Sequence, residues 1–327
     1  MLRFVVTPGH GYTFSALGAG FLTAQPVKCE IWTYPQLFQT RRLPPGAWVF
    51  SDIERLSNWE LMLAGEAAAA LRAAGPRFKV YTDPAVAACR YELLLRLHRA
   101  GINRFRAWRA EDGIPDARYP VFIRQESSHQ FPLTQLIGSP QAVQAEFDRL
   151  AREGIARRGL LVIEYEAEEL RPGIFRKYAA YRFGDRIVAD HMVHDISWVA
   201  KLGNPAAWSD QNHLDEAEYV RANPHEETLM QAFKLAAIDY GRADYGVVGG
   251  KVQIWEINTN PTLPSGDLKK LNSPLRTEAT LLSLKNRIEA LREMALKPQG
   301  PSMRLATPNI TNFRSRQTWR QRHLIRE

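Results

Sequence analysis

The sequence of 327 residues contains few cysteines and no long hydrophobic segment. Its two cysteines, Cys29 and Cys89, form no C-x-x-C motif, and so small a number argues against a disulfide scaffold. We therefore expect two buried thiols in a cytoplasmic protein. No apolar run reaches the ~20 residues that span a bilayer, so we expect no membrane partner. The first residues, MLRFVVTPG, indicate a β-strand rather than a secretion signal.

The apolar and charged fractions, 45% and 24%, are those of a globular protein long enough for two or three lobes. Short apolar runs alternate with helical patterns, which predicts an α/β fold with α+β lobes and a small parallel sheet at the N-terminus. The predicted strands are Leu2–Thr7, Cys29–Tyr34, Ala47–Asp52 and Phe78–Thr82. The predicted helices are Trp59–Ala74, Ala85–Ala100, Pro140–Glu153, Glu226–Tyr240 and Thr277–Leu296. The segment Asp195–Pro224 has few regular signals, and it is either a functional lid or partly helix.

The segment Gly241–Pro264, GRADYGVVGGKVQIWEINTNPTLP, predicts a β-hairpin with hard oxygen ligands on one face. Residues two apart on a strand point to the same side, so Glu256 and Asn258 share a face. A two-residue Gly249-Gly250 loop would turn Asp244 away from Glu256. A three-residue loop that includes Lys251 pairs Asp244 with Glu256, and we favour it because it keeps the large apolar groups, Trp255 among them, on the other face.

Carboxylate and amide oxygens grouped in this way suit Mg²⁺, which keeps several waters and is completed by substrate phosphates. Asp244, Glu256 and Asn258 are therefore the candidate metal ligands. The alternative is a surface hairpin with ordinary polar residues on its wet face.

The Arg-x-Asp strand, the glycine turn and the Glu-x-Asn-x-x-Pro strand resemble the metal-binding end of the ATP-grasp family. This resemblance implies ATP and Mg²⁺ as cofactors, and it extends over roughly Thr82–Leu296. It implies a Rossmann-like pre-ATP-grasp domain in residues 1–82, an ATP-grasp domain of two lobes in 83–296, and a basic tail in 297–327. Arg242 matches an arginine near the transferred phosphoryl group.

The resemblance also assigns the nucleotide-facing residues, which are Arg90, Arg124, Glu164, Tyr165, Glu168 and Lys201. Arg90 and Arg124 occupy positions where the family has lysine over the phosphates. Glu164 and Tyr165 belong to the strand that leads into the adenine hinge, Glu168 would bind the ribose, and Lys201 would add a phosphate contact.

The hairpin Ile174–Val193 resembles the family's Asp-Ile-Arg strand pair and places Arg176 at the reacting end, although its aspartate is absent. Since Arg176 and Lys177 alternate, only one faces the nucleotide, and the family pattern favours Arg176 and leaves Lys177 to solvent. The loop Glu126–Pro132 has no glycine, unlike the glycine-rich phosphate flap of many relatives.

Three functions fit these observations. The first is a ligase that activates a small-molecule or peptide carboxylate as an acyl phosphate and joins it to an amine or other nucleophile. The second is a small-molecule kinase with the same ATP end. The third is a nucleotide-binding protein that associates with nucleic acid through its tail.

Two other segments each allow more than one interpretation. Residues 298–327 contain six arginines and one acidic residue, and so provide +5 of the net charge of +8. They are a nucleic-acid arm, an extension that is loose or packed across the body, or an attractor of anionic substrates. The segment His10–Tyr12 follows the first strand and is either a substrate-side loop or a plain turn.

Overall fold

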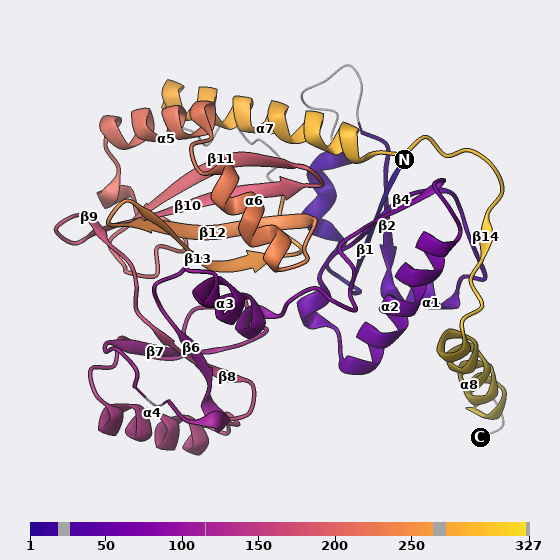
Figure 1. Ribbon diagram of the computed structural model, residues 1–327, viewed down its shortest axis with the longest axis horizontal. Helices are drawn as coiled ribbons and strands as arrows, with labels where there is room; N and C mark the ends of the chain where they lie inside the picture. The colour runs from indigo at the N-terminus through magenta and orange to yellow at the C-terminus, as the bar shows by residue number, and fades with distance from the viewer. Residues whose placement is uncertain (19–26, 115, 264–272, 325–327) are drawn as a thin grey trace.

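The computed structural model of the chain describes residues 1–18, 27–114, 116–263 and 273–324. Pro264, the last residue of the hairpin motif, lies outside these ranges. Figure 1 shows an N-terminal α/β unit, a small middle unit around β6, β7 and β8, and a C-terminal unit built on long antiparallel strands. No helix within the described ranges is long and apolar enough to cross a bilayer.

The N-terminal unit contains the predicted parallel sheet, with strand order β2-β1-β4-β5. Its strands are β1 (Leu2–Val6), β2 (Cys29–Thr33), β4 (Gly46–Phe50) and β5 (Phe78–Tyr81). Its helices are α1 (Tyr34–Gln39), α2 (Asn58–Ala73) and the short 3₁₀ segments η1 (Gly11–Gly18) and η2 (Ile53–Arg55). The first turn of α2 is closed by a capping box between Ser57 and Glu60, which satisfies backbone donors at the helix start.

The order of the strands places a topological switch point between β1 and β4. These two strands are neighbours, but the chain continues from β1 to β2 on one side and from β4 to β5 on the other. Open α/β sheets bind ligands in the crevice at the carboxyl ends of such strands. The residues that follow β1 and β4 therefore occupy a position that favours ligand binding.

The middle unit is a three-stranded antiparallel sheet of order β6-β8-β7 with helices against it. Its elements are α3 (Arg90–Arg99), β6 (Ala107–Arg109), η3 (Ala110–Asp112), β7 (Val121–Gln125), α4 (Pro140–Arg152) and β8 (Leu160–Glu164). The apolar face of α4 packs on the sheet through Val143, Phe147 and Leu150. Helix α3 begins at Arg90, the residue that the family resemblance places at the start of this helix, and not at Ala85, where the apolar pattern alone would begin it.

The C-terminal unit is an antiparallel sheet of order β11-β10-β12-β13, with β9 paired to β10. Its strands are β9 (Glu169–Arg171), β10 (Ile174–Phe183), β11 (Arg186–Asp195), β12 (Tyr240–Val248) and β13 (Lys251–Asn258). Its helices are η4 (Pro205–Ala207), α5 (Asp210–Ala222), α6 (Glu226–Leu235) and α7 (Pro274–Met294). The segment Asp195–Pro224 is thus mostly helix from Asp210 onward, while residues 196–204 form a loop.

The N-terminal sheet and the C-terminal unit share one hydrophobic core. Phe4 packs against Tyr240, with ring centroids 5.1 Å apart, and Leu2 belongs to the same buried cluster as Phe183 and Leu291. Burial of large apolar side chains from both units stabilises their relative position. The carboxyl edge of the N-terminal sheet is therefore held against the end of β13.

The basic tail packs across the N-terminal unit. It forms β14 (Met303–Arg304), which pairs with β3 (Arg42–Leu43), and α8 (Pro308–Leu324). Leu305 and Ile310 are fully buried in the core of this unit, and the Arg314 guanidinium donates to the Phe38 and Thr40 carbonyls at 2.7 and 2.8 Å. Over its described residues, the tail is the packed extension that the sequence left as one of several possibilities.

Candidate active site

The hairpin β12–β13 pairs Asp244 with Glu256 and Arg242 with Asn258. The pairing of the carboxylates is as predicted, but the predicted three-residue loop is wrong. The turn is the two-residue loop Gly249-Gly250, with Val248 opposite Lys251, and the register shifts at a bulge.

Trp255 is the extra residue of that bulge, because Tyr245 pairs with Ile254 and Asp244 pairs with Glu256. Trp255, which we expected among the apolar groups, packs against the hydrophobic cluster of Leu94, Phe105 and Ile163, but it is only half-buried. Its half-buried ring lies over Gly246, where a Cβ atom would come within 2.7 Å of it, and it lines the cleft that contains both carboxylates.

Asp244 is buried between two cations. Lys177 Nζ donates to Asp244 Oδ2 at 2.9 Å, and Arg242 Nε donates to Oδ1 at 2.9 Å. Burial alone would raise the pKa of Asp244, but the charges of Arg242 and Lys177 outweigh burial and lower it. The carboxylate is therefore ionised at neutral pH.

The prediction for the two alternating residues of β10 is wrong in its orientation. Lys177 is 8% exposed and lines the cleft, so it is not solvated. Arg176 lies on the opposite side of the strand, where its guanidinium is 3.5 Å from Asp215 and stacks on Tyr178. The structure thus does not bring Arg176 to the candidate reacting end.

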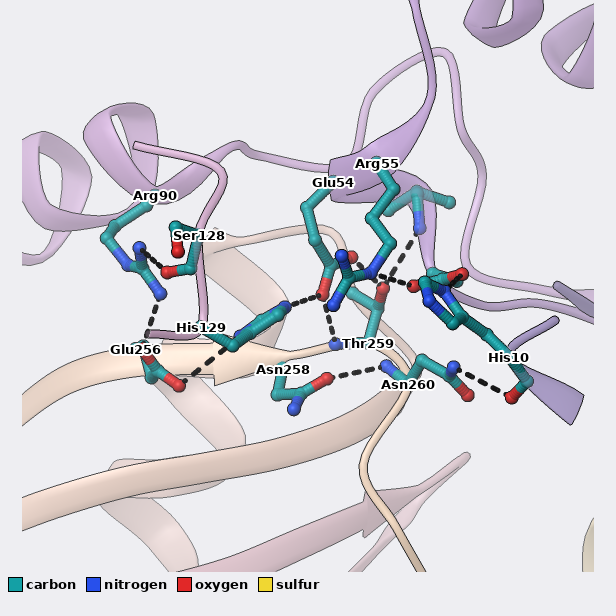
Figure 2. A network of polar contacts seen from close by, with 12 residues as sticks. His10, Glu54, Arg55, Arg90, Ser128, His129, Glu256, Asn258, Thr259 and Asn260 are labelled. Atoms are coloured by element: carbon teal, nitrogen blue, oxygen red, sulfur yellow. Dashed lines mark hydrogen bonds and ion pairs between the residues drawn. The ribbon is translucent and has the colours of Figure 1, made fainter. Parts of the chain in front are cut away.

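Glu256 lies between three cations, two of which, Arg90 and His129, are seen in Figure 2. Arg90 forms a very short ion pair with Oε2, Arg124 is 3.4 Å from the same oxygen, and His129 Nδ1 is 3.6 Å from Oε1. Burial opposes ionisation of Glu256, but the charges of Arg90, His129 and Arg124 hold its pKa well below the ordinary value. Burial, followed by the charge of Arg90, lowers the pKa of Arg124 to about 10.

His129 connects the loop after β7 to the N-terminal unit, as Figure 2 shows. Its Nε2 is 2.9 Å from Glu54 Oε1, and Glu54 also accepts from the backbone and side chain of Thr259. Although burial opposes it, bonding to Glu256 and Glu54 raises the pKa of His129 to about 9, so the ring is an imidazolium at neutral pH. Neither His129 nor Glu54 was among the predicted site residues, because no local pattern connects residues so distant in the chain.

An apolar cavity adjoins the charged group. Phe122 and Trp198 are in aromatic contact, with ring centroids 5.0 Å apart, and Tyr165 meets Trp198 edge-on at 5.7 Å. The middle unit and the C-terminal unit both line the cavity. Its lining residues include Leu94, Phe105, Phe122, Ile163, Glu164, Tyr165, Glu166, Ala167, Trp198 and Trp255. This aromatic slot suits a planar heterocycle, and residues 164–167 border it.

The remaining predicted residues divide between the cleft and its surroundings. Lys201 lines the cleft and donates to the His129 carbonyl, while burial lowers its pKa. The Glu164 carboxylate turns away and accepts from Arg106 Nη2 at 2.8 Å, so only its backbone is placed to meet a ligand. Glu168 is exposed and caps the hairpin turn at the Gly249 N–H, and it does not line the cleft.

The chemistry of the donors fits a metal-bound polyphosphate. Arg90 Nε and Arg124 Nε are buried donors without a hydrogen-bond partner in the described chain, a state that costs about 1–3 kcal/mol per group. No three His, Cys, Asp or Glu side chains within the described ranges form a complete metal site. Two carboxylates and the Asn258 amide suit Mg²⁺, which takes its other ligands from water and phosphate.

Comparison with known proteins gives matches among solved structures alone. No protein-family model matches the chain, and no curated protein matches it. A structure of the ATP-grasp ligase PsnB with a phosphomimetic variant of its minimal precursor, Mg and ADP aligns with a TM-score of 0.51 and 12% identity. The alignment covers 90% of this chain and 96% of PsnB.

Two further structures align over similar lengths. D-alanine–D-alanine ligase from Bacillus anthracis has a TM-score of 0.47 and 13% identity, with coverage of 90% and 98%. N5-carboxyaminoimidazole ribonucleotide synthetase from Thermus thermophilus has a TM-score of 0.48 and 13% identity, with coverage of 92% and 81%. The mixed α/β architecture and the PsnB alignment agree with the resemblance in the hairpin motif, and the chain has the ATP-grasp fold.

Proposed function

We propose that this protein is an ATP-dependent ligase that activates a carboxylate as an acyl phosphate and transfers the acyl group to an amine. The observation that carries the proposal is a single cleft that joins the aromatic slot to the carboxylates of Asp244 and Glu256 and to the cations Arg124, Lys177 and Lys201. The aromatic slot suits the base of ATP, the carboxylates suit the metal ion on its phosphates, and the cations suit the phosphoryl group that is transferred.

In this proposal each part of the cleft binds one part of the nucleotide. The adenine enters the aromatic slot against the rings of Phe122 and Trp198, where residues 164–167 border it. Asp244, Glu256 and Asn258 hold Mg²⁺, which when bound neutralises phosphate charge. Arg90, Arg124 and Lys201 bind the phosphate oxygens, as the resemblance of the sequence implies for these positions.

Arg242 and Lys177 border the group that is transferred. The substrate carboxylate attacks the terminal phosphorus of ATP, ADP leaves, and an acyl phosphate forms. An amine then attacks the acyl carbon, and phosphate leaves. The side chains of Arg242 and Lys177 stabilise charge on the moving phosphoryl group, because both point from the sheet to the side on which Asp244 lies.

The acid is a small molecule or a peptide, and the PsnB ligase, which was solved with its precursor, favours including peptides among the candidates. The test is a screen of amino acids and short peptides with ATP, Mg²⁺ and hydroxylamine. We expect ADP and phosphate in equal amounts and a hydroxamate of the correct acid. A stable phosphorylated product without hydroxamate would instead identify a kinase with the same ATP site.

The variant Glu256→Gln tests the metal assignment, because it keeps the size of the side chain and removes its charge. We expect turnover to fall by ~10²-fold or more, as for removal of a group that stabilises transition-state charge. The matched control is Glu168→Gln, which changes a carboxylate outside the cleft and should leave turnover close to that of the unmodified protein. Unchanged turnover in Glu256→Gln would exclude the metal assignment.

A further inference from the structure

A second polar group lies at the switch point of the N-terminal sheet, and the function proposed above uses none of its residues. Thr7 and His10 follow β1, and Asp52 follows the neighbouring strand β4. These are the adjacent carboxyl ends between which open α/β sheets bind ligands. Figure 2 shows His10 at the opposite end of the polar network from Arg90.

The contacts of Asp52 define this group. Its Oδ2 accepts from the Thr7 hydroxyl, from the Thr7 N–H at 3.1 Å and from His10 Nδ1 at 2.8 Å. Its Oδ1 accepts from Arg55 Nε at 2.9 Å. The Asp52 side chain is 1% exposed, whereas the His10 side chain is 30% exposed. A buried, fully bonded carboxylate thus holds one nitrogen of a partly accessible imidazole.

This arrangement determines which nitrogen of His10 carries the proton in the neutral ring. A carboxylate can only accept, so the bond to Asp52 requires the proton on Nδ1. The Thr7 hydroxyl gives its own proton to Asp52, so its oxygen can also accept from His10 Nδ1, 2.7 Å away. Nε2 is then left with a lone pair, as in the histidine of acid–base dyads.

The backbone conformation of Asp52 also indicates that the contact between Asp52 and His10 has a function. Asp52 has φ 59° and ψ 26°, in the left-handed region that non-glycine residues occupy at a cost. Aspartate and asparagine tolerate this region better than other side chains. The conformation turns the carboxylate back toward the end of β1, where His10 lies.

His10 is joined directly to the strand that carries the candidate metal ligands. Asn260 donates from Nδ2 to the His10 carbonyl at 3.4 Å, and its own N–H donates to Asn258 Oδ1 at 2.8 Å. Thr13, in the 3₁₀ segment η1 that follows His10, donates from its hydroxyl to Asn260 Oδ1 at 2.8 Å. The pair of His10 and Asp52, called the dyad here, is therefore held against the end of β13, two hydrogen bonds from Asn258.

We propose that His10 is the general base that deprotonates the amine acceptor, with Asp52 as the residue that positions it. This inference rests on the proposed ligase function. The amine nitrogen forms the bond to the acyl carbon, and the bond from that carbon to the phosphate oxygen breaks. The bonding electrons leave with phosphate, and the N–H proton passes to His10 Nε2.

The first test separates acyl transfer to a basic amine from transfer to a nucleophile that needs no base. His10→Asn places an amide donor near the position of Nδ1, which keeps the bond to Asp52 and removes the basic nitrogen. The acid is the one that yields a hydroxamate in the screen above. The acceptors are two basic amines, glycine and L-lysine, and hydroxylamine, which is largely unprotonated at neutral pH and so needs no base. We expect amide formation to fall by ~10²-fold or more and hydroxamate formation to stay near the unmodified rate.

The second test measures the tautomer directly and needs no substrate. Histidine-selective ¹⁵N labelling of the full chain should show His10 protonated on Nδ1 when the ring is neutral. Asp52→Asn preserves the left-handed backbone, but its amide can donate to Nδ1 and so favours the opposite tautomer. We expect this variant to lose amide formation and to retain hydroxamate formation, which a merely structural role of Asp52 would not produce.

The control is His98→Gln, a change in a histidine on α3 whose Nδ1 is 3.2 Å from the Asn103 carbonyl and which belongs to neither the cleft nor the dyad. It should leave both products unchanged. Equal loss of amide and hydroxamate in His10→Asn, or an Nε2-protonated ring in the unmodified protein, would overturn the assignment of His10 and leave the ligase function intact. If the unmodified protein forms no hydroxamate with any acid, the proposed function fails, and the base assignment fails with it.

Discussion

The orientation of Lys177 and Arg176 gives the sharpest test of the site, because the two residues are adjacent and face opposite sides of β10. In Lys177→Met, Asp244 loses the ammonium at 2.9 Å and keeps the Arg242 guanidinium on its other oxygen. Breaking a buried ion pair costs about 3–5 kcal/mol. Because Arg242 still neutralises Asp244, we expect the loss of unfolding free energy at the lower end of this range, about 3 kcal/mol.

The matched change Arg176→Met removes a weaker contact. Arg176 is 3.5 Å from Asp215, and the two side chains are 24% and 31% exposed. Partly exposed pairs contribute about 0–1 kcal/mol, and stacking on Tyr178 adds about 0.5–1 kcal/mol. We therefore expect a loss of unfolding free energy of about 1 kcal/mol and almost no change in turnover.

Urea unfolding and ATP turnover measured on both variants separate the two side chains. Lys177→Met should lower turnover by ~10²-fold or more, because it removes a cation next to the transferred group. If instead Arg176→Met abolished turnover and Lys177→Met retained it, Arg176 would be the residue at the reacting end, as the family pattern implied. The reasoning from the register of β10 and β12 would then be refuted.

Three further predictions concern other parts of the molecule. The folded-state pKa of His129, about 9, exceeds its ordinary 6.5, so its stabilisation is complete below pH 6.5 and is lost as the pH rises through 9. Urea unfolding should show that the free energy of unfolding declines by up to about 3 kcal/mol over this window in the unmodified protein and not in His129→Asn. Equal pH dependence in the two proteins would contradict the ion pairs of His129. Trp198→Leu should weaken ATP binding by about 1–2 kcal/mol in calorimetry, and unchanged affinity would exclude the aromatic slot as the adenine site. Ile310→Ala should destabilise the fold by about 2–5 kcal/mol without changing ATP affinity, whereas a neutral effect would indicate that the tail is not packed.

The local features of the site follow from the sequence, since they depend on strand periodicity. The alternation of β13 places Glu256 and Asn258 on one face, and the need to bury large apolar groups selects the pairing of Asp244 with Glu256. A three-residue loop and a bulge at Trp255 both give that pairing, so periodicity cannot choose between them.

The features that the sequence could not give depend on contacts between distant segments. Alternation indicates that only one of Arg176 and Lys177 faces the cleft, but the choice depends on the alignment of β10 with β12. His129 meets Glu54 from 75 positions away in the chain, and a loop without glycine contains no local signal for this contact. Only the packing of the three units places these charges together.

The charge of Glu256 is balanced by side chains that would also bind phosphate. Glu256 holds Arg90, Arg124 and His129, and a metal ion at Glu256 would compete with all three for its oxygens. Two of these cations also contain buried donors without partners in the described chain, Arg90 Nε and Arg124 Nε. Release of the guanidinium groups from the carboxylate would make them available to phosphate, so the metal and the nucleotide would each lower the cost of binding the other. Arg90 and Arg124 stand where the family has lysine. Their planar guanidinium groups can exchange one anion, the Glu256 carboxylate, for another, a phosphate.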